Sequence, residues 1–175
     1  MPKKLWEPSK ELIKNSNLFA YEKFISKYYK YNFSRNYKKL LKWSVKNPKD
    51  FWNSIWEYFE VVGKKTDKFK LTKDLINSKF FVNSKLNFAE NLLAKNSNQK
   101  AITFVSENGY REQKSWKELN IDVKKIITFY KKINISEKDR IAAYTPNQIE
   151  TVECFLGASA IGSIWSSCSP DFGVP

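Results

Sequence analysis

Residues 139–169 read DRIAAYTPNQIETVECFLGASAIGSIWSSCS, and this stretch decides the fold of the chain. Residues 141–145 are nearly free of charge, which is typical of a buried strand. Apolar residues recur at helical spacing over 148–161, and Gly162 is placed to end that helix. Residues 163–167 predict the next strand. A strand, a helix and a strand joined by short loops imply a parallel sheet with a right-handed crossover.

The residues before this unit predict a hairpin and a further helix. Residues 101–114 hold two β-rich segments separated by Glu-Asn-Gly, which is a turn signal. Ser115 and Glu118 form a capping-box pattern at the start of an amphipathic helix. We therefore expect the α/β class for the chain from about residue 100 onward. Because a parallel sheet needs neighbours on both sides, we expect this sheet to be incomplete and the chain to continue past Pro175.

The first 95 residues predict mainly short helices, with connecting loops and short strands over residues 60–85. Apolar residues between 18 and 28 follow helical spacing, and Asn47-Pro48 supplies a cap and a first-turn proline for a further helix. That helix carries an aromatic and aliphatic stripe, formed by Phe51, Trp52, Ile55, Trp56 and Phe59. A stripe of this kind can be a ligand platform, but we expect it to pack on a neighbouring domain.

The formal net charge of +13 raises the possibility of nucleic-acid binding. The excess is nearly all lysine and is spread along the chain. Arginine, the residue favoured for bidentate recognition of bases and phosphates, occurs only at Arg35, Arg111 and Arg140. We therefore expect a solvated basic surface, with neither nucleic acid nor membrane as a partner.

The chain contains no histidine, which excludes Ser-His and Cys-His catalysis and removes the commonest metal ligand. We predict no metal site. Cys154 and Cys168 lack a C-x-x-C spacing and no signal peptide precedes them, so we expect a reducing, cytoplasmic location. The least polar stretch, 154–165, is too short to span a bilayer.

Several segments resemble one family when they are taken together. Residues 86–93, LNFAENLL, are similar to the opening motif of short-chain acyl-CoA synthetases, and residues 139–147 resemble the strand and helix cap that follow there. Residues 166–173, SSCSPDFG, are similar to the acetoacetyl-CoA branch of that family. Two departures are that Lys138 stands where the family usually has glycine, and that residues 79–82, KFFV, replace the usual Trp-Phe-Pro-Gly.

The resemblance implies the amino-terminal part of an adenylate-forming ligase. Residues 1–95 would be its mainly helical amino-terminal extension and residues 96–175 the start of its AMP-binding α/β large domain. Such enzymes use ATP and Mg²⁺ to activate acetoacetate as an acyl-adenylate, and then pass the acyl group to coenzyme A (CoA). In the family, the catalytic residues lie beyond the position that matches Pro175. We therefore expect no catalytic residue here, no binding of ATP, Mg²⁺ or CoA by this chain alone, and dependence on the missing carboxy-terminal remainder of the chain.

The candidate binding residues are Ser167, Cys168 and Ser169. They follow a predicted strand at the carboxyl edge, where parallel sheets bind ligands, and they could line the acyl or CoA channel. A small-residue turn needed for close packing would also explain them. Gly157 and Gly162 have the spacing of a phosphate loop, but they lie at the end of a helix, so we do not expect phosphate binding there.

Two other functions stay open at this point. One is a free-standing, basic and aromatic-rich interaction module, which would fold cooperatively as it stands. The other is a related acetyl-CoA or propionyl-CoA synthetase, although those enzymes carry a Gly-rich sequence before their Ser-Pro.

Overall fold

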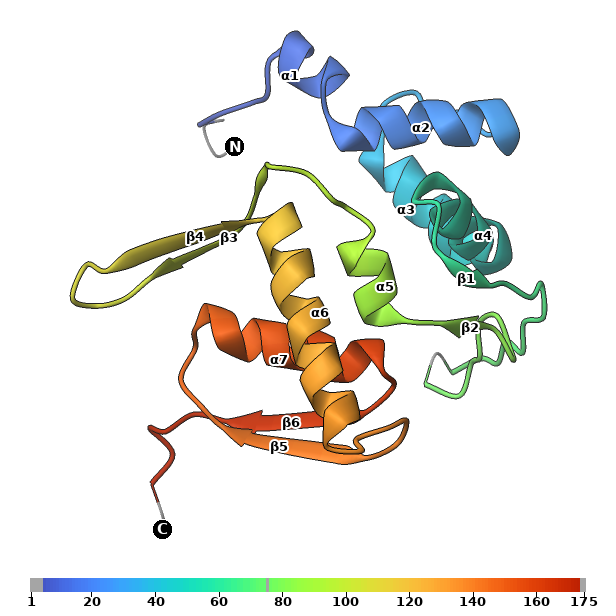
Figure 1. Ribbon diagram of the computed structural model, residues 1–175. Helices are drawn as coiled ribbons and strands as arrows, with labels where there is room; N and C mark the ends of the chain where they lie inside the picture. The colour runs from blue at the N-terminus through green and yellow to red at the C-terminus, as the bar shows by residue number, and fades with distance from the viewer. Residues whose placement is uncertain (1–4, 75, 174–175) are drawn as a thin grey trace. The chain divides into compact units, whose positions relative to one another are not determined.

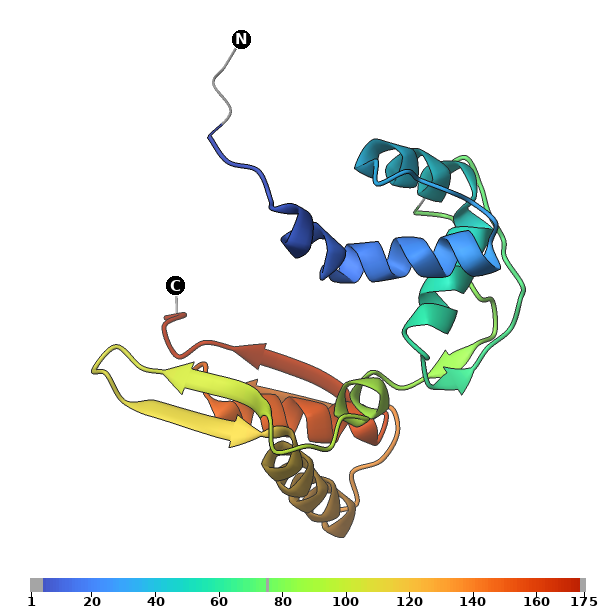
Figure 2. The same cartoon turned by 90° about the horizontal axis from the view of Figure 1, so that it is seen from above.

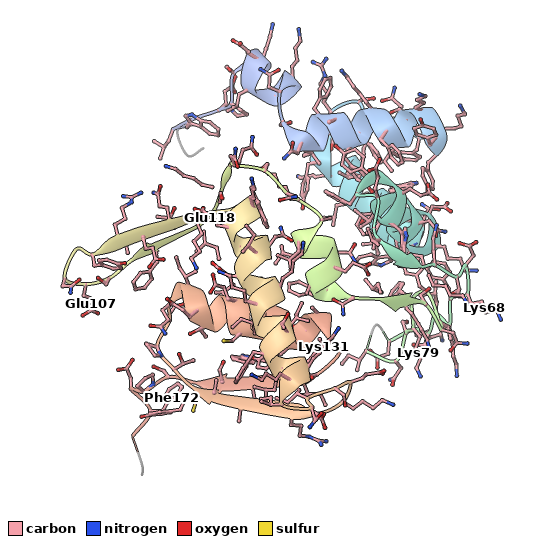
Figure 3. All side chains as sticks on the ribbon, in the orientation of Figure 1. Lys68, Lys79, Glu107, Glu118, Lys131 and Phe172 are labelled. Carbon is pink, nitrogen blue, oxygen red and sulfur yellow. The ribbon has the colours of Figure 1, made fainter. Side chains whose placement is uncertain are left out.

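The computed structural model describes residues 5–74 and 76–173, which form two compact units (Figures 1 and 2). The first unit holds the chain up to Val61 together with Lys65–Ser84. The second unit holds Val62–Lys64 together with the chain from Lys85 onward. Within the described residues, no helix is both long and apolar enough to cross a membrane.

The first unit is built from helices α1 (Lys10–Lys14), α2 (Asn17–Tyr28), α3 (Tyr37–Lys46) and α4 (Pro48–Tyr58). Ser16 caps α2, because its Oγ accepts a hydrogen bond from Phe19 N at 3.2 Å. α4 begins with Pro48, whose missing N–H costs no hydrogen bond in the first turn. The helices predicted from the apolar spacing at 18–28 and from Asn47-Pro48 are therefore confirmed.

An aromatic core holds these helices together. Its buried members are Tyr21, Ile25, Phe33, Leu40 and Trp43. Phe33 comes from the loop between α2 and α3, and its ring centroid lies 5.5 Å from that of Trp43. Burial of a phenylalanine side chain contributes about 1.5–3 kcal/mol, so Phe33 anchors this loop.

The aromatic stripe on α4 is a packing face, as predicted, and its partners lie in the same unit. Trp52 stacks near Phe80, with ring centroids 5.5 Å apart, and Trp56 lies 4.9 Å from Phe81. The expectation of a neighbouring domain as the partner is wrong for these two rings. The reason is that the loop after residue 65 returns to α4 and covers it.

Up to residue 173, the described part of the second unit contains three two-stranded sheets. Its elements are β1 (Gly63–Lys64), β2 (Lys85–Leu86), α5 (Phe88–Leu93), β3 (Lys100–Val105), β4 (Arg111–Ser115), α6 (Trp116–Lys132), β5 (Arg140–Tyr144), α7 (Ile149–Ala160) and β6 (Ile164–Cys168). β3 and β4 form the predicted antiparallel hairpin. The capping box before α6 is also confirmed: Ser115 Oγ accepts from Glu118 N at 3.2 Å, and Ser115 N donates to Glu118 Oε2 at 2.7 Å.

β5 and β6 are parallel and are joined through α7, as predicted (Figure 1). Their side chains are at most half-buried, however, so the expectation of a buried strand is wrong. Ile141 and Ala143 are half-buried, whereas Tyr144 is 67% exposed and Ile164 is 49% exposed. Successive side chains of a strand point to opposite faces, and α7 packs against β6 on one face of this pair.

The core of the second unit lies between its helices. Its buried members are Ala89, Leu119, Val123 and Leu156, from α5, α6 and α7. α5 therefore packs with the second unit, although the predicted division of the chain falls after residue 95. That division follows the parts of the acyl-CoA synthetase family, and it stays a prediction.

Candidate functional site

The carboxyl ends of β5 and β6 meet at one edge of the sheet, because the two strands are parallel. Thr145 N, just after β5, donates a hydrogen bond to Cys168 O at 3.2 Å. The Tyr144 hydroxyl donates to Pro170 O at 2.9 Å. These two bonds turn the chain after β6 back over the end of β5. The edge is the place at which open α/β sheets bind ligands.

The structure places Ser167, Cys168 and Ser169 at this edge but points their side chains in different directions. Ser167 lies opposite Ala143 in the register and on the same face as Trp165, whose Nε1 donates to Ser167 Oγ at 3.2 Å. Cys168 lies opposite Tyr144, on the uncovered face of the pair. The alternation of side chains along a strand therefore separates Ser167 from Cys168.

Ser169 lies beyond the strand and shapes the turn that follows. Its Oγ donates to Asp171 Oδ2 at 2.9 Å and accepts from Asp171 N at 3.3 Å. This local side-chain to backbone pairing is typical of turns. The hydroxyl of Ser169 is therefore already engaged, while Ser167 and Cys168 are exposed at the edge.

The chemistry available at this edge is that of small polar groups. Ser166, Ser167 and Cys168 offer hydroxyls and a thiol to a neutral ligand, and Asp171 is the charged residue of the segment 165–173. No lysine or arginine lies in that segment to hold a phosphate. Across residues 5–74 and 76–173, no three His, Cys, Asp or Glu side chains gather closely enough to hold a metal ion. The edge is therefore suited to lining a channel.

The two glycines of the rejected phosphate loop have packing roles. A Cβ at Gly157 would lie 2.6 Å from Ile126 Cγ2, so the glycine lets α7 approach α6 closely. Gly162 has φ +77° and ends α7 in the left-handed region. Neither glycine lies at the start of a helix.

Both departures from the family pattern include a residue whose backbone φ is positive. Lys138 has φ +73°, in the left-handed region that glycine adopts most easily. Phe81 has φ +49°, a conformation that proline cannot reach because its ring holds φ near −65°. The turn at residues 79–82 therefore differs from a Pro-Gly turn.

A groove of about 660 Å³ begins directly after β5 and was not predicted from the sequence. Ile102, Phe104, Ile149 and Val152 form much of its apolar wall, and Pro146 lies at the end nearest β5. The loop between a strand and the following helix is a common place for ligands in α/β folds, but the opposite wall of this groove comes from β3, more than 40 residues earlier in the chain.

A second groove, of about 560 Å³, lies in the first unit and carries Lys23, Lys27 and Arg35. Glu22 is buried beside it. Burial raises the pKa of Glu22, and the charge of Arg35 opposes this shift. The groove combines basic side chains with the ring of Phe19, over which Arg35 lies at 5.1 Å.

A buried ion cluster joins the hairpin to the helices of the second unit. Lys114 Nζ lies 2.6 Å from Glu153 Oε1 and 2.8 Å from Asp122 Oδ2. Burial lowers the pKa of Lys114, but hydrogen bonds to Asp122 and Glu153 and the charges of both carboxylates outweigh it, so the pKa is raised. The cluster connects β4 to α6 and α7, and Glu153, at 6% exposure, is its most buried member.

Comparisons with known proteins give a consistent result. The family model described as the acetyl-coenzyme A synthetase N-terminus matches residues 37–92. The acetoacetyl-coenzyme A synthetase of Rhizobium meliloti (strain 1021) is 34% identical over 170 residues, which are 97% of this chain and 26% of that protein. The acetoacetyl-CoA synthetase of Xenopus tropicalis is 39% identical over 146 residues, 79% of this chain and 21% of that protein.

The fold agrees with these sequence matches. The solved structure of acetoacetyl-CoA synthetase from Streptomyces lividans superposes with a TM-score of 0.87 and 25% identity, over 98% of this chain and 27% of that chain. The chain therefore spans about a quarter of the length of the relatives it matches.

Proposed function

We propose that this chain, which is homologous to the amino-terminal quarter of acetoacetyl-CoA synthetases, forms that part of an ATP-dependent acetoacetate–CoA ligase. The observation that carries the proposal is the match in fold and in sequence over nearly the whole chain. In the reaction of such a ligase, the carboxylate of acetoacetate attacks ATP, with release of pyrophosphate. The thiol of CoA then displaces AMP to give acetoacetyl-CoA.

The residues described here do not fit the sites of ATP and Mg²⁺. The carboxyl edge of β5 and β6 carries hydroxyls and a thiol, whereas a polyphosphate needs cations or a cradle of N–H groups. We therefore assign no step of the reaction to these residues. Their part in the function is to build the scaffold and to contribute to one wall of the substrate channel.

For that wall, the small side chains at the end of β6 are the best candidates. Ser167, Cys168 and Ser169 lie at the carboxyl edge of a parallel pair, and the first two are exposed there. Neutral hydroxyl and thiol groups suit the amide-containing arm of CoA, which ends in a thiol, or the neutral end of an acyl group. The two cysteines are free thiols, which fits a cytoplasmic ligase whose substrates are the small molecules acetoacetate, ATP and CoA.

A chimeric enzyme tests the proposal directly. The residues of the Rhizobium meliloti relative that align with this chain are replaced by this chain, and pyrophosphate release is measured with ATP, Mg²⁺, acetoacetate and CoA. We expect activity that depends on both substrates. A control chimera carrying Ala143→Asp should lose this activity, because the substitution places a charge at a half-buried position of β5. A chimera that folds but releases no pyrophosphate would contradict the proposal.

The channel wall is tested in the same chimera. Cys168→Trp should raise KM for CoA or acetoacetate, because the large ring would fill the uncovered edge. Cys154→Ala serves as the matched control, since Cys154 lies on α7. If Cys168→Trp lowers only the thermal stability and leaves both KM values unchanged, Cys168 has a packing role alone.

The chain alone gives a separate test. Thermal shift of the 175-residue chain with ATP and Mg²⁺, with acetoacetate and with CoA should show no saturable change. A saturable shift with ATP would overturn the assignment of nucleotide binding to other parts of the enzyme.

A further inference from the structure

The segment Val62–Lys64 packs with the second unit, although the chain on both sides of it packs with the first. Its strand β1 pairs antiparallel with β2, with Gly63 opposite Leu86 and Lys64 opposite Lys85. A ribbon of two such short strands is marginal by itself in water. Further contacts are needed to hold the segment in place.

Asn91 supplies these contacts from α5. Its Oδ1 accepts a hydrogen bond from Val62 N at 2.8 Å, and its Nδ2 donates to Val62 O at 2.9 Å. The side-chain amide thus pairs with both backbone groups of Val62, as a residue of a neighbouring strand would. It extends the pairing of β1 and β2 by one residue, on the side where the chain leaves the first unit.

α5 is itself tied to the second unit. Asn87 Oδ1 accepts from Glu90 N at 3.1 Å and so caps the helix, while Asn87 Nδ2 donates to Ser159 O at 2.8 Å at the end of α7. Ala89 is fully buried in the core between α6 and α7. Asn91 is therefore held in position by a helix that is fixed at its first turn.

Gly63 lets the two strands approach closely. A Cβ at this position would lie 2.7 Å from Lys85 O and 2.8 Å from Leu86 Cβ. The first contact is with backbone, which cannot move aside like the end of a flexible side chain. A side chain at residue 63 would therefore push β1 away from β2.

We propose that Asn91, positioned by Asn87, and Gly63 form a latch that docks the segment Val62–Lys64 onto the second unit. Asn91 is a positioning residue in this latch. The chain enters the segment Val62–Lys64 from the first unit and returns to that unit after it. The latch therefore makes the local stability of this segment depend on the core of the second unit. The two asparagines of the LNFAENLL motif thereby gain a physical role that does not depend on catalysis.

Hydrogen exchange of the full 175-residue chain, followed residue by residue, tests the latch. Asn91→Ala should speed the exchange of the Val62 amide by about tenfold, because that N–H loses its acceptor. The amides in the middle of α6 should change less than twofold. The matched control is Asn98→Ala, at an exposed asparagine outside this region, and it should change neither.

Asn91→Asp separates the latch from a general loss of packing. An ionised aspartate still accepts from Val62 N but cannot donate to Val62 O. At neutral pH, the exchange rate of the Val62 amide should therefore lie between that of the unmodified chain and that of Asn91→Ala, after correction for the intrinsic pH dependence of exchange. It should slow relative to Asn91→Ala as the pH falls below about 4 and the carboxyl regains a proton to donate.

Gly63→Ala gives a second approach that leaves Asn91 intact. It should speed the hydrogen exchange of the same amides. Gly173→Ala, where an added Cβ meets nothing within 4 Å, should not change their exchange. Loss of protection confined to residues 61–65 and 84–87 is the expected result. Unchanged exchange at Val62 in Asn91→Ala, or an equal loss across the whole chain, would overturn the proposal.

Discussion

The ion cluster around Lys114 gives the sharpest energetic prediction. Lys114 lies on β4 and Glu153 on α7, 39 residues further along the chain. The side chain of Glu153 is 6% exposed and that of Lys114 is 19% exposed. Lys114→Met removes the cation and leaves a buried carboxylate without its partner.

The expected cost follows from this burial. Breaking a buried ion pair costs about 3–5 kcal/mol, because the remaining charge is uncompensated. Lys114 retains some contact with water, and Glu153 can take up a proton, so we expect about 2–3 kcal/mol here. Lys125→Met is the matched control, since Lys125 bonds to Asp122 at 2.7 Å but is 71% exposed. Its loss should cost about 0–0.5 kcal/mol.

Hydrogen exchange of the slowest amides of α6 and α7 measures this cost within the second unit. Lys114→Met should speed them by about 30- to 150-fold, which corresponds to the same free energy. The double variant Lys114→Met with Glu153→Gln should recover most of the loss, because neither charge is then left unpaired. A cost for Lys114→Met no larger than that for Lys125→Met would refute the reasoning.

The pH dependence of the cluster has a defined sign. Hydrogen bonds from Lys114 and Lys125 hold the pKa of Asp122 below its ordinary value of 3.8. This stabilisation is present above that value and is lost as the pH falls through the lower pKa of the folded state. The raised pKa of Lys114 contributes stability that is lost only as the pH rises through that raised value. The cluster should therefore be insensitive to pH near neutrality and weaken in acid.

Four further variants test individual contacts by thermal or urea unfolding. Gly157→Ala should destabilise by about 1–3 kcal/mol, because the new Cβ would overlap Ile126; no change would mean that α7 can shift away at no cost. Lys138→Gly should stabilise by about 0.5–1 kcal/mol by relieving a left-handed lysine, and a loss of stability would contradict that account. Ser115→Ala should cost about 1 kcal/mol through loss of the cap. Hydrogen bonds from the Ser115 side chain and backbone lower the pKa of Glu118, so helix content measured by circular dichroism should decline as the pH falls below 4.5, and less so in Ser115→Ala. Phe33→Ala should cost about 3–5 kcal/mol in the first unit, and a smaller effect than that of Tyr31→Ala would show that the loop is not anchored by Phe33.

Sequence patterns formed by residues close together along the chain were sufficient to predict much of the fold. The capping box of Ser115 and Glu118, the turn before β4 and the first-turn proline of α4 each involve groups a few residues apart. The same holds for Gly162, whose backbone conformation ends α7. Such local preferences act before any tertiary contact forms, so they can be recognised without one.

The candidate site was predictable in place but not in detail. That Ser167, Cys168 and Ser169 lie at a carboxyl edge followed from the strand, helix and strand pattern. Which face each side chain takes depends on the register with β5, and a shift of one residue would exchange the faces. The groove beside Pro146 was missed because its wall includes β3, which is more than 40 residues away.

By itself, the sequence predicted the order and type of the elements from residue 100 onward and two helices before them, and through its motifs the resemblance to acyl-CoA synthetases. The tertiary structure alone decided that α7 packs against β6, that Lys114 contacts Glu153, and that Asn91 pairs with Val62. The physical reason is distance along the chain. Hydrogen bonds within a turn or a cap depend on neighbouring residues, whereas burial and ion pairing depend on which distant segments the whole fold brings together.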